Sequence, residues 1–315
     1  MNKVLVTGGA GFIGSHFIFE ALKKNWEVYN IDCLNYAANL KNLQSIEKNP
    51  NYHFVQENIC NQTFIKDFLK KEKFDFIIHF AAETHVDRSI ENPNIFTKTN
   101  VLGTQTLAEE ALQNQVKNFL HISTDEVYGD LKKNDPSFTE NCLIKPNSPY
   151  SASKASSDLL VLSYVKTFGF NAIVTRCSNN FGPHQDASKL IPVIIKKALK
   201  NEDIPIYGDG KNIRDWLYVK DHIKALFLVL EKGKSGEVYN IGGNNEYSNL
   251  DLVKIILKIL NKPESLISFI KDRPGHDFRY AVNTKKITEQ LNWQVSENFL
   301  ANLEKTVEWY KKIYK

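Results

Sequence analysis

Short apolar runs alternate with helix-like segments along the first half of the chain. The run from Val4 to Val6 contains no polar residue, which is typical of a strand that is buried on both faces. Similar runs predict strands at residues 3–7, 27–32, 52–56, 74–80, 118–123 and 171–175. Apolar positions at helical spacing fall between them, at residues 16–24, 62–71 and 93–113. Strands and helices that alternate, joined by right-handed crossovers, predict an α/β fold with a doubly wound parallel sheet.

The regular alternation ends near residue 176. Prolines and glycines mark longer connections beyond that point. Further helical or strand-like segments are predicted at residues 219–230, 238–241, 250–260 and 303–310. No low-complexity linker separates the two parts. We therefore predict a first domain at residues 1–176 and a smaller C-terminal α/β region at residues 177–315 that is interleaved with it.

Composition and charge exclude several classes of function. Hydrophobic residues make up 42% of the 315 positions and charged residues 24%, as in ordinary globular proteins. The 40 lysines and arginines barely outnumber the 36 aspartates and glutamates and are spread along the chain, so we expect no nucleic-acid partner. No apolar run reaches membrane-spanning length, and the chain starts directly with a strand-like run. We therefore expect neither a membrane segment nor a secretory leader.

The four cysteines, Cys33, Cys60, Cys142 and Cys177, are isolated from one another. Neither a CxxC pair nor a histidine at metal-ligand spacing accompanies them, so we expect no metal site. We interpret the cysteines as reduced thiols and the chain as a cytoplasmic protein.

A glycine-rich turn follows the first predicted strand. Gly8, Gly11 and Gly14 leave the backbone bare at the start of the next helix, whose positive N-terminus can face a pyrophosphate. The strand at residues 27–32 ends in Asp32, close to the spacing of about 20 residues at which a carboxylate meets a ribose hydroxyl. This pattern is typical of the Rossmann fold and favours NAD over NADP. A simple cap of the strand end is the alternative interpretation of Asp32.

Polar residues gather where the predicted strand at residues 118–123 gives way to a loop. Ser123, Thr124, Asp125 and Glu126 would face a ligand, since ligands bind beyond the carboxyl ends of the strands in such sheets. Two neighbouring carboxyl groups suit an elimination, in which one group accepts a proton and another donates one. Repulsion between them raises one pKa, but which carboxyl stays protonated is open. The plainer interpretation is a solvated turn.

Tyr150 and Lys154 lie one helical turn apart, so on a helix their side chains share a face. An ammonium group beside a phenol favours the phenolate and lowers the pKa of the phenol. The pair therefore predicts that Tyr150 is a general base, although tyrosine and lysine at this spacing also occur by chance.

These motifs resemble the extended short-chain dehydrogenase/reductase superfamily, which binds NAD and acts on nucleotide-activated sugars. A more specific similarity, to the family of dTDP-glucose 4,6-dehydratases, covers nearly the whole chain. It is carried by residues 79–89, 123–129, 176–183, 189–192, 214–216 and 272–277. Epimerases of the superfamily usually lack an adjacent acid pair, so Asp125 and Glu126 are the discriminating residues.

The resemblance implies a hydro-lyase that uses NAD and converts dTDP-glucose to its 4-keto-6-deoxy product. Tyr150 would take the proton of the 4-hydroxyl, with Thr124 hydrogen-bonded at that oxygen and Lys154 at the nicotinamide ribose. Glu126 would remove the proton from C5, and Asp125 would protonate the departing 6-hydroxyl.

The resemblance also implies binding residues for the cofactor and for the nucleotide sugar. The cofactor would be held by Gly8, Gly11, Phe12, Ile13, Gly14, Asp32, Asn58, Ile59, Ala81, Ala82, Thr99, Tyr150 and Lys154. The nucleotide sugar would meet Thr84, Asn179, Lys189, Leu190, Pro205, Tyr207, Arg214, Asn240, Arg273 and His276, mostly in the second region. A homodimer is implied as well, formed through the helices at residues 101–113 and 156–168.

Three other interpretations stay open. The substrate could be UDP-glucose or another nucleotide hexose, because Phe278 stands where the family has an arginine. An NAD-dependent C4 epimerase would need Tyr150 but would have no use for Asp125 and Glu126. A non-catalytic NAD-binding scaffold would keep the fold without needing the catalytic residues.

Overall fold

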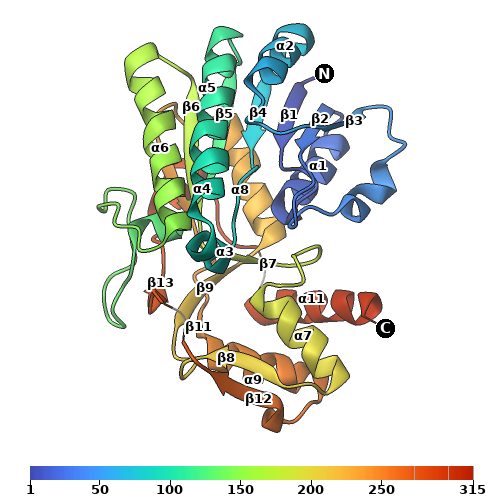
Figure 1. Ribbon diagram of the computed structural model, residues 1–315, viewed down its shortest axis with the longest axis vertical. Coiled ribbons are helices and arrows are strands. Elements are labelled where there is room, and N and C mark those ends of the chain that lie inside the picture. The colour runs from blue at the N-terminus through green and yellow to red at the C-terminus, as the bar shows by residue number, and fades with distance from the viewer. Residues whose placement is uncertain (273, 297, 315) are drawn as a thin grey trace.

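The computed structural model describes residues 1–272, 274–296 and 298–314, and a seven-stranded parallel sheet forms its centre (Figure 1). The strand order is β10 (Val238–Ile241), β6 (Ala172–Cys177), β5 (Asn118–Thr124), β4 (Phe76–His79), β1 (Lys3–Thr7), β2 (Glu27–Asp32) and β3 (Tyr52–Gln56). All six neighbouring pairs are parallel. The predicted doubly wound parallel sheet is therefore confirmed.

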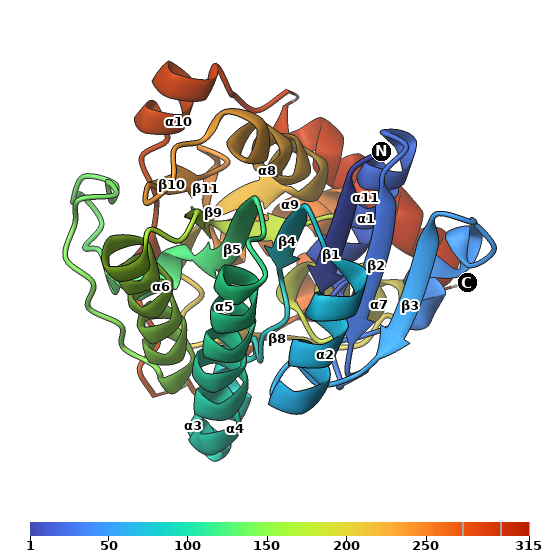
Figure 2. The ribbon, with the colours of Figure 1, turned by 90° about the horizontal axis from the view of Figure 1, so that it is seen from above.

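Helices cover both faces of the sheet (Figure 2). One face carries α1 (Phe12–Lys23) and α8 (Val219–Lys232), and the other carries α2 (Gln62–Glu72), α5 (Thr104–Gln113) and α6 (Pro149–Phe168). Val4 and Val6 belong to the core on one side of the sheet, while Leu5 belongs to the core on the other. This arrangement explains why the first strand is apolar at successive positions.

A second layer lies below the central sheet in Figure 1. Its four-stranded sheet joins β7 (Asn179–Phe181), β9 (Ile213–Tyr218), β11 (Glu246–Ser248) and β13 (Arg279–Tyr280), and a parallel pair joins β8 (Ile204–Tyr207) and β12 (Ile267–Ile270). Its helices are α7 (Leu190–Lys200), α9 (Asn249–Leu260) and α11 (Phe299–Ile313), whereas α10 (Lys285–Leu291) packs on β10 and α8 of the first layer (Figure 2). Between these segments the chain returns to the first layer through α8 and β10. Residues beyond 176 thus contribute to both layers.

The helix predicted at residues 93–113 changes its geometry along its length. It comprises α4 (Pro93–Phe96), a π-helical segment η2 (Thr97–Gly103) and α5. Within η2 the amide of Asn100 accepts a hydrogen bond from the Glu83 backbone N–H at 2.8 Å and donates one to Ser153 Oγ at 2.8 Å. The predicted helix is therefore confirmed along its whole length, with π-helical geometry at the segment where this side chain contacts α6 and the loop after β4.

The remaining elements are short. They are α3 (Val86–Glu91) and three 3₁₀ helices, η1 (Leu40–Ile46), η3 (Asp125–Tyr128) and η4 (Glu264–Leu266). Within the described residues, no helix combines the length and the apolar composition that a membrane span requires.

Gly243 follows β10, where two backbone segments come unusually close. A Cβ atom there would lie 1.9 Å from the carbonyl oxygen of Trp216 on β9. We expect Gly243→Ala to lower the free energy of unfolding by about 3 kcal/mol, since the backbone cannot yield as a flexible side chain would. Urea denaturation measures the loss.

Gly169 provides the matched control for this prediction. It has a φ of +67°, but an added Cβ would meet nothing within 4 Å. Gly169→Ala should therefore cost only about 1 kcal/mol, the strain of the left-handed backbone. Equal losses for the two variants would show that crowding at Gly243 is not what matters.

Candidate active site

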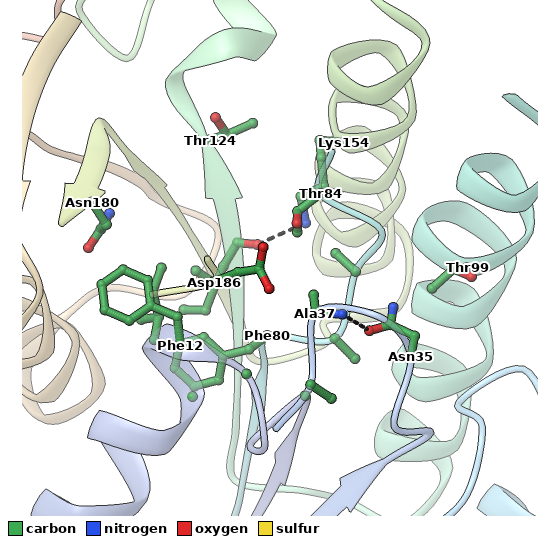
Figure 3. Close-up of a pocket in the computed structure, with 18 of the residues that line it drawn as sticks. Phe12, Asn35, Ala37, Phe80, Thr84, Thr99, Thr124, Lys154, Asn180 and Asp186 are labelled. Carbon is green, nitrogen blue, oxygen red and sulfur yellow. Dashed lines mark hydrogen bonds between the residues drawn. The ribbon is translucent and has the colours of Figure 1, made fainter. Parts of the chain in front are cut away.

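A cavity of about 280 Å³ opens at the carboxyl ends of the central strands. Its walls come from the ends of β1, β2, β4, β5 and β6, from α6 and from the loop between β7 and α7. Figure 3 shows Thr124 at the end of β5, Lys154 on α6, and Phe12 at the start of α1. The cavity therefore lies at the edge of the sheet where ligands of such folds bind.

The glycine turn shapes one end of this cavity. Gly8 has a φ of +73°, and a Cβ on Gly14 would lie 2.5 Å from the carbonyl oxygen of Gly8. Helix α1 starts beside it with no side-chain cap on Gly11 and no acidic residue in its first turn. The positive end of this helix is thus uncompensated and close to the backbone, which suits a pyrophosphate.

Asp32 lies at the end of β2 on the same cavity. Its carboxylate accepts hydrogen bonds from the backbone N–H groups of Ala10 at 3.0 Å and Leu34 at 2.9 Å. Burial raises its pKa, and these two hydrogen bonds act against that rise. A carboxylate fixed in this way fits a ligand with paired ribose hydroxyls.

All residues predicted to hold the cofactor line the cavity. They are Gly8, Gly11, Phe12, Ile13, Gly14, Asp32, Asn58, Ile59, Ala81, Ala82, Thr99, Tyr150 and Lys154. This end of the cavity fits NAD, because the uncapped start of α1 and the glycine turn suit a pyrophosphate and Asp32 suits a ribose.

The acid pair lies where β5 turns into the short helix η3. Thr124 is the N-cap of η3, and its Oγ1 accepts a hydrogen bond from the Glu126 backbone N–H at 3.3 Å. The same hydroxyl donates to Asp125 Oδ1 at 3.3 Å. Capping by Thr124 therefore fixes both acids at the cavity wall, and Asp125 is almost completely buried.

Electrostatics separate the two acids. Burial raises the pKa of Asp125 well above its usual value, and the nearby charges of Glu126 and Asp215 raise it further. Among the buried polar atoms of the described residues, Asp125 Oδ2 has no hydrogen-bond partner. Asp125 is thus the carboxyl whose environment favours the protonated form, with an oxygen available to a ligand.

Tyr150 and Lys154 lie on α6 opposite the acid pair. Lys154 Nζ donates to the carbonyl oxygen of Ile122 at 2.8 Å, and burial lowers its pKa to about 8. Burial and the Glu126 charge raise the pKa of Tyr150 well above its usual value, against a hydrogen bond from Thr124. The prediction that Lys154 lowers this pKa is wrong, because the Lys154 ammonium group donates to the carbonyl oxygen of Ile122.

Three of the predicted substrate residues line the cavity, namely Thr84, Asn179 and Lys189. Lys189 Nζ donates to the carbonyl oxygen of Thr84 at 3.3 Å and so joins opposite walls. Asn179 Oδ1 is buried and lacks a hydrogen-bond partner in the described part of the chain. These groups are placed to meet a polar ligand.

The other predicted substrate residues do not line the cavity. They are Leu190, Pro205, Tyr207, Arg214, Asn240 and His276, while Arg273 lies outside the described residues. Asn240 is engaged elsewhere, since it accepts from the Tyr128 hydroxyl at 2.8 Å and donates to the Phe138 carbonyl at 3.0 Å.

Arg214, Tyr207 and His276 belong to the second layer. The Arg214 guanidinium donates to the carbonyl oxygens of Ile213 at 2.7 Å and Asp277 at 3.0 Å. The rings of Tyr207 and His276 are 6.0 Å apart. None of the three side chains lines the cavity, but Arg214 is close enough for its charge to lower the pKa of Asp125.

Sequence reasoning missed several lining residues, namely Asn35, Tyr36, Ala37, Ala38, Cys177, Asn180, Gln185 and Asp186. Most are on loops, where no periodic pattern marks them. Tyr36 is held by the Arg88 guanidinium, which lies 3.7 Å from the centre of its ring. Asn180 had a sequence signal, since it belongs to the motif at residues 176–183.

Comparison with known proteins identifies the family. The family model described as GDP-mannose 4,6 dehydratase matches residues 5–306. The dTDP-glucose 4,6-dehydratase of Escherichia coli is 48% identical over 98% of this chain and 93% of its own length. The chain belongs to the dTDP-glucose 4,6-dehydratase family.

Solved structures agree with this family. The dTDP-glucose 4,6-dehydratase DesIV of Streptomyces venezuelae, with NAD and TYD bound, superposes with a TM-score of 0.95 at 43% identity, covering 98% of this chain and 97% of its own. The UDP-glucose 4-epimerase of Thermotoga maritima reaches a TM-score of 0.93 at 29% identity, covering 99% and 100% of the two chains. Dehydratase and epimerase thus share the fold, and the fold by itself does not distinguish the two activities.

Proposed function

We propose that the chain is an NAD-dependent hydro-lyase that converts dTDP-glucose to dTDP-4-keto-6-deoxyglucose. The observation that carries the proposal is one cavity lined by the acid pair Asp125 and Glu126, by Tyr150 and Lys154, and by residues that fit NAD. NAD would be held by the glycine turn and Asp32, and when bound it would supply the hydride chemistry at C4 and C6 and a positive charge that favours the phenolate of Tyr150.

The roles of the residues follow from their places on the cavity wall. Tyr150 takes the proton of the 4-hydroxyl, while the Thr124 hydroxyl hydrogen-bonds that oxygen and Lys154 orients the cofactor ribose. The 4-keto group acidifies C5, and Glu126 removes its proton and gives a proton back to C5 when hydride reaches C6. Asp125, protonated by virtue of its burial, donates to the departing 6-hydroxyl.

Residues on the opposite wall are proposed to hold the nucleotide sugar. Thr84, Asn179 and Lys189 line the cavity, and the Lys189 ammonium can pair with a diphosphate. Arg214 and His276 would complete the site from the second layer once ligand contacts replace the present ones. We infer a reducing, cytoplasmic location from the four cysteines, which are free thiols.

Mass spectrometry of the protein incubated separately with dTDP-glucose and UDP-glucose tests this function. Loss of one water from dTDP-glucose, with little from UDP-glucose, is the expected result. Equal loss from both sugars would favour a dehydratase of broader base preference. An epimerised hexose without loss of water would instead support a C4 epimerase, and bound NAD without any turnover would support a scaffold.

We also propose a homodimer formed through η2 and α6. Leu102 on η2 is 53% exposed, and Leu159 and Phe168 on α6 are 56% and 58% exposed. Large apolar side chains on neighbouring helices of one face suit a helix-to-helix interface between two copies.

The variant Leu159→Glu is expected to convert the dimer to a monomer, because it buries a charge in the proposed interface. Sedimentation velocity measures the change in mass. The control is Leu143→Glu, at a leucine that is 72% exposed in a loop and lies on neither helix. A monomeric native protein, or dissociation by both substitutions, would contradict the proposed interface.

A further inference from the structure

A charged cluster is buried directly behind Lys154, outside the lining of the cavity. Asp158 and Arg176 are almost wholly inaccessible, and Arg176 Nε donates to Asp158 Oδ2 at 2.8 Å. His121 Nε2 lies 3.4 Å from Asp158 Oδ1. Burying such charges is costly unless they are paired, and the proposed mechanism leaves this cluster unused.

The cluster and Lys154 are held by the same two elements. Lys154 and Asp158 are four residues apart on α6, so they share one face of the helix. Lys154 Nζ donates to the carbonyl oxygen of Ile122 on β5, and Asp158 meets the side chain of the preceding residue, His121. Two consecutive positions of β5 are thus tied to one helix face, which sets where the Lys154 ammonium group lies.

Asp158 is the negatively charged residue of this cluster. Burial alone would raise its pKa, but the adjacent His121 ring, whose Nε2 also hydrogen-bonds Ser157 Oγ at 3.1 Å, and the charge of Arg176 bring it below its usual value. On β4 and β5, burial lowers the pKa of His79 well below its usual value and that of His121 to about 4, so both rings are neutral. Burial lowers the pKa of Lys154, and Asp158 opposes that fall.

The other titratable groups that line the cavity with Lys154, or that interact with Lys154 or Arg176, lie on three elements. Tyr150 lies on α6, Cys177 follows Arg176 on β6, and Asp125, Glu126 and Tyr128 lie on η3. Burial raises the pKa of Cys177 and of Tyr128 to about 12, so both are neutral at working pH. Asp158 is therefore the carboxylate behind Lys154, while the acid pair lies across the cavity.

We propose that Asp158 is a positioning residue for the reaction, and that its carboxylate fixes α6 against β5 and β6 and keeps the Lys154 ammonium group charged. Arg176 pairs with this carboxylate from β6, while the place of Asp158 on α6 sets its position behind Lys154. The inference rests on the proposed function only for its kinetic readout, because the charge of Lys154 can also be measured without turnover.

The test compares Asp158→Asn with the native enzyme across a range of pH. At alkaline pH, kcat is expected to fall as Lys154 loses its proton, and this part of the pH profile is called the alkaline limb. In Asp158→Asn we expect the alkaline limb to shift to lower pH by about one unit or more, which is about a tenfold loss of rate above the limb. In NMR of ¹³C-labelled lysine, the Lys154 signal, assigned with Lys154→Arg, should titrate at a correspondingly lower pH. If the native protein dehydrates no sugar, the proposed function fails, but the NMR titration still decides this inference.

The variant Arg176→Gln distinguishes the effect of the Asp158 charge from the effect of losing the ion pair that packs α6 against β6. It breaks the same ion pair but leaves the Asp158 carboxylate behind Lys154, so its alkaline limb should stay in place or move up. If both variants lower the limb, or if folded Asp158→Asn titrates like the native enzyme, the proposal is overturned. Should Asp158→Asn not fold, the limb of Arg176→Gln decides in the same way.

Asp221→Asn is the control for loss of a buried carboxylate. Asp221 is 1% exposed on α8, with partners Lys224 and Ser296 far from the cavity lining. It should lower the unfolding temperature without moving the alkaline limb. A limb that shifts in this variant too would mean that the shift reports lost stability, and would overturn the role given to Asp158.

Discussion

Replacing Glu126 with glutamine is expected to stop the loss of water while oxidation at C4 continues. Glutamine keeps the shape of the side chain but cannot take the C5 proton, so elimination should slow by about 10²–10⁴-fold. The enzyme should then hold the 4-keto sugar and reduced cofactor together. Near-ultraviolet absorbance of NADH in a single turnover, with mass spectrometry of the sugar, measures both events.

The matched control for this variant is Glu110→Gln. Glu110 is a buried glutamate on α5 and does not line the cavity. The Glu110→Gln enzyme should dehydrate dTDP-glucose at the native rate. If Glu126→Gln also dehydrates at the native rate, Glu126 is not the base, and another acceptor must remove the C5 proton.

Replacing Tyr150 with phenylalanine is expected to abolish the first step as well as the later ones. Without the phenol no group on the cavity wall takes the proton of the 4-hydroxyl, so reduced cofactor should not form, with a loss of about 10²–10⁴-fold in rate. Binding of NAD should persist, because the glycine turn and Asp32 are untouched. Stopped-flow absorbance and calorimetry with NAD measure the two properties.

Tyr239→Phe is the control for the loss of a buried phenol. Tyr239 on β10 is fully buried, and its hydroxyl donates to Gln290 Oε1 at 3.2 Å outside the cavity. This variant should form reduced cofactor normally. Formation of NADH by Tyr150→Phe at the native rate would remove Tyr150 from the proton transfer at C4.

The central sheet was predictable from sequence because each strand obeys a local rule. The apolar run from Val4 to Val6 predicts a strand that is buried on both faces, and these residues pack on both faces of the sheet. The π-helical geometry of η2 was not predictable, because its Asn100 side chain contacts Ser153, which lies 53 residues away along the chain. Long-range hydrogen bonds of this kind leave no periodic trace in the sequence.

The candidate site was predictable where a motif coincides with a strand end or a helix start. Gly8 to Gly14, Asp32 and the acid pair all meet this condition and line the cavity. The electrostatics were not predictable, because they depend on burial. The phenol of Tyr150 was expected to have a lowered pKa, but enclosure of the ring and the facing Glu126 carboxylate raise it.

The edge position of β10 affects the order in which the protein can fold during synthesis. Strand β10 pairs with β6, and α8 packs with α1 on one face of the sheet, as the stacked rings of Phe17 and Phe227 show at 4.6 Å. A nascent chain that ends before Ile241 therefore lacks an outer strand, and one that ends before α8 leaves the apolar face around Phe17 uncovered. Completion of the nucleotide-binding layer must wait until roughly three quarters of the protein has left the ribosome.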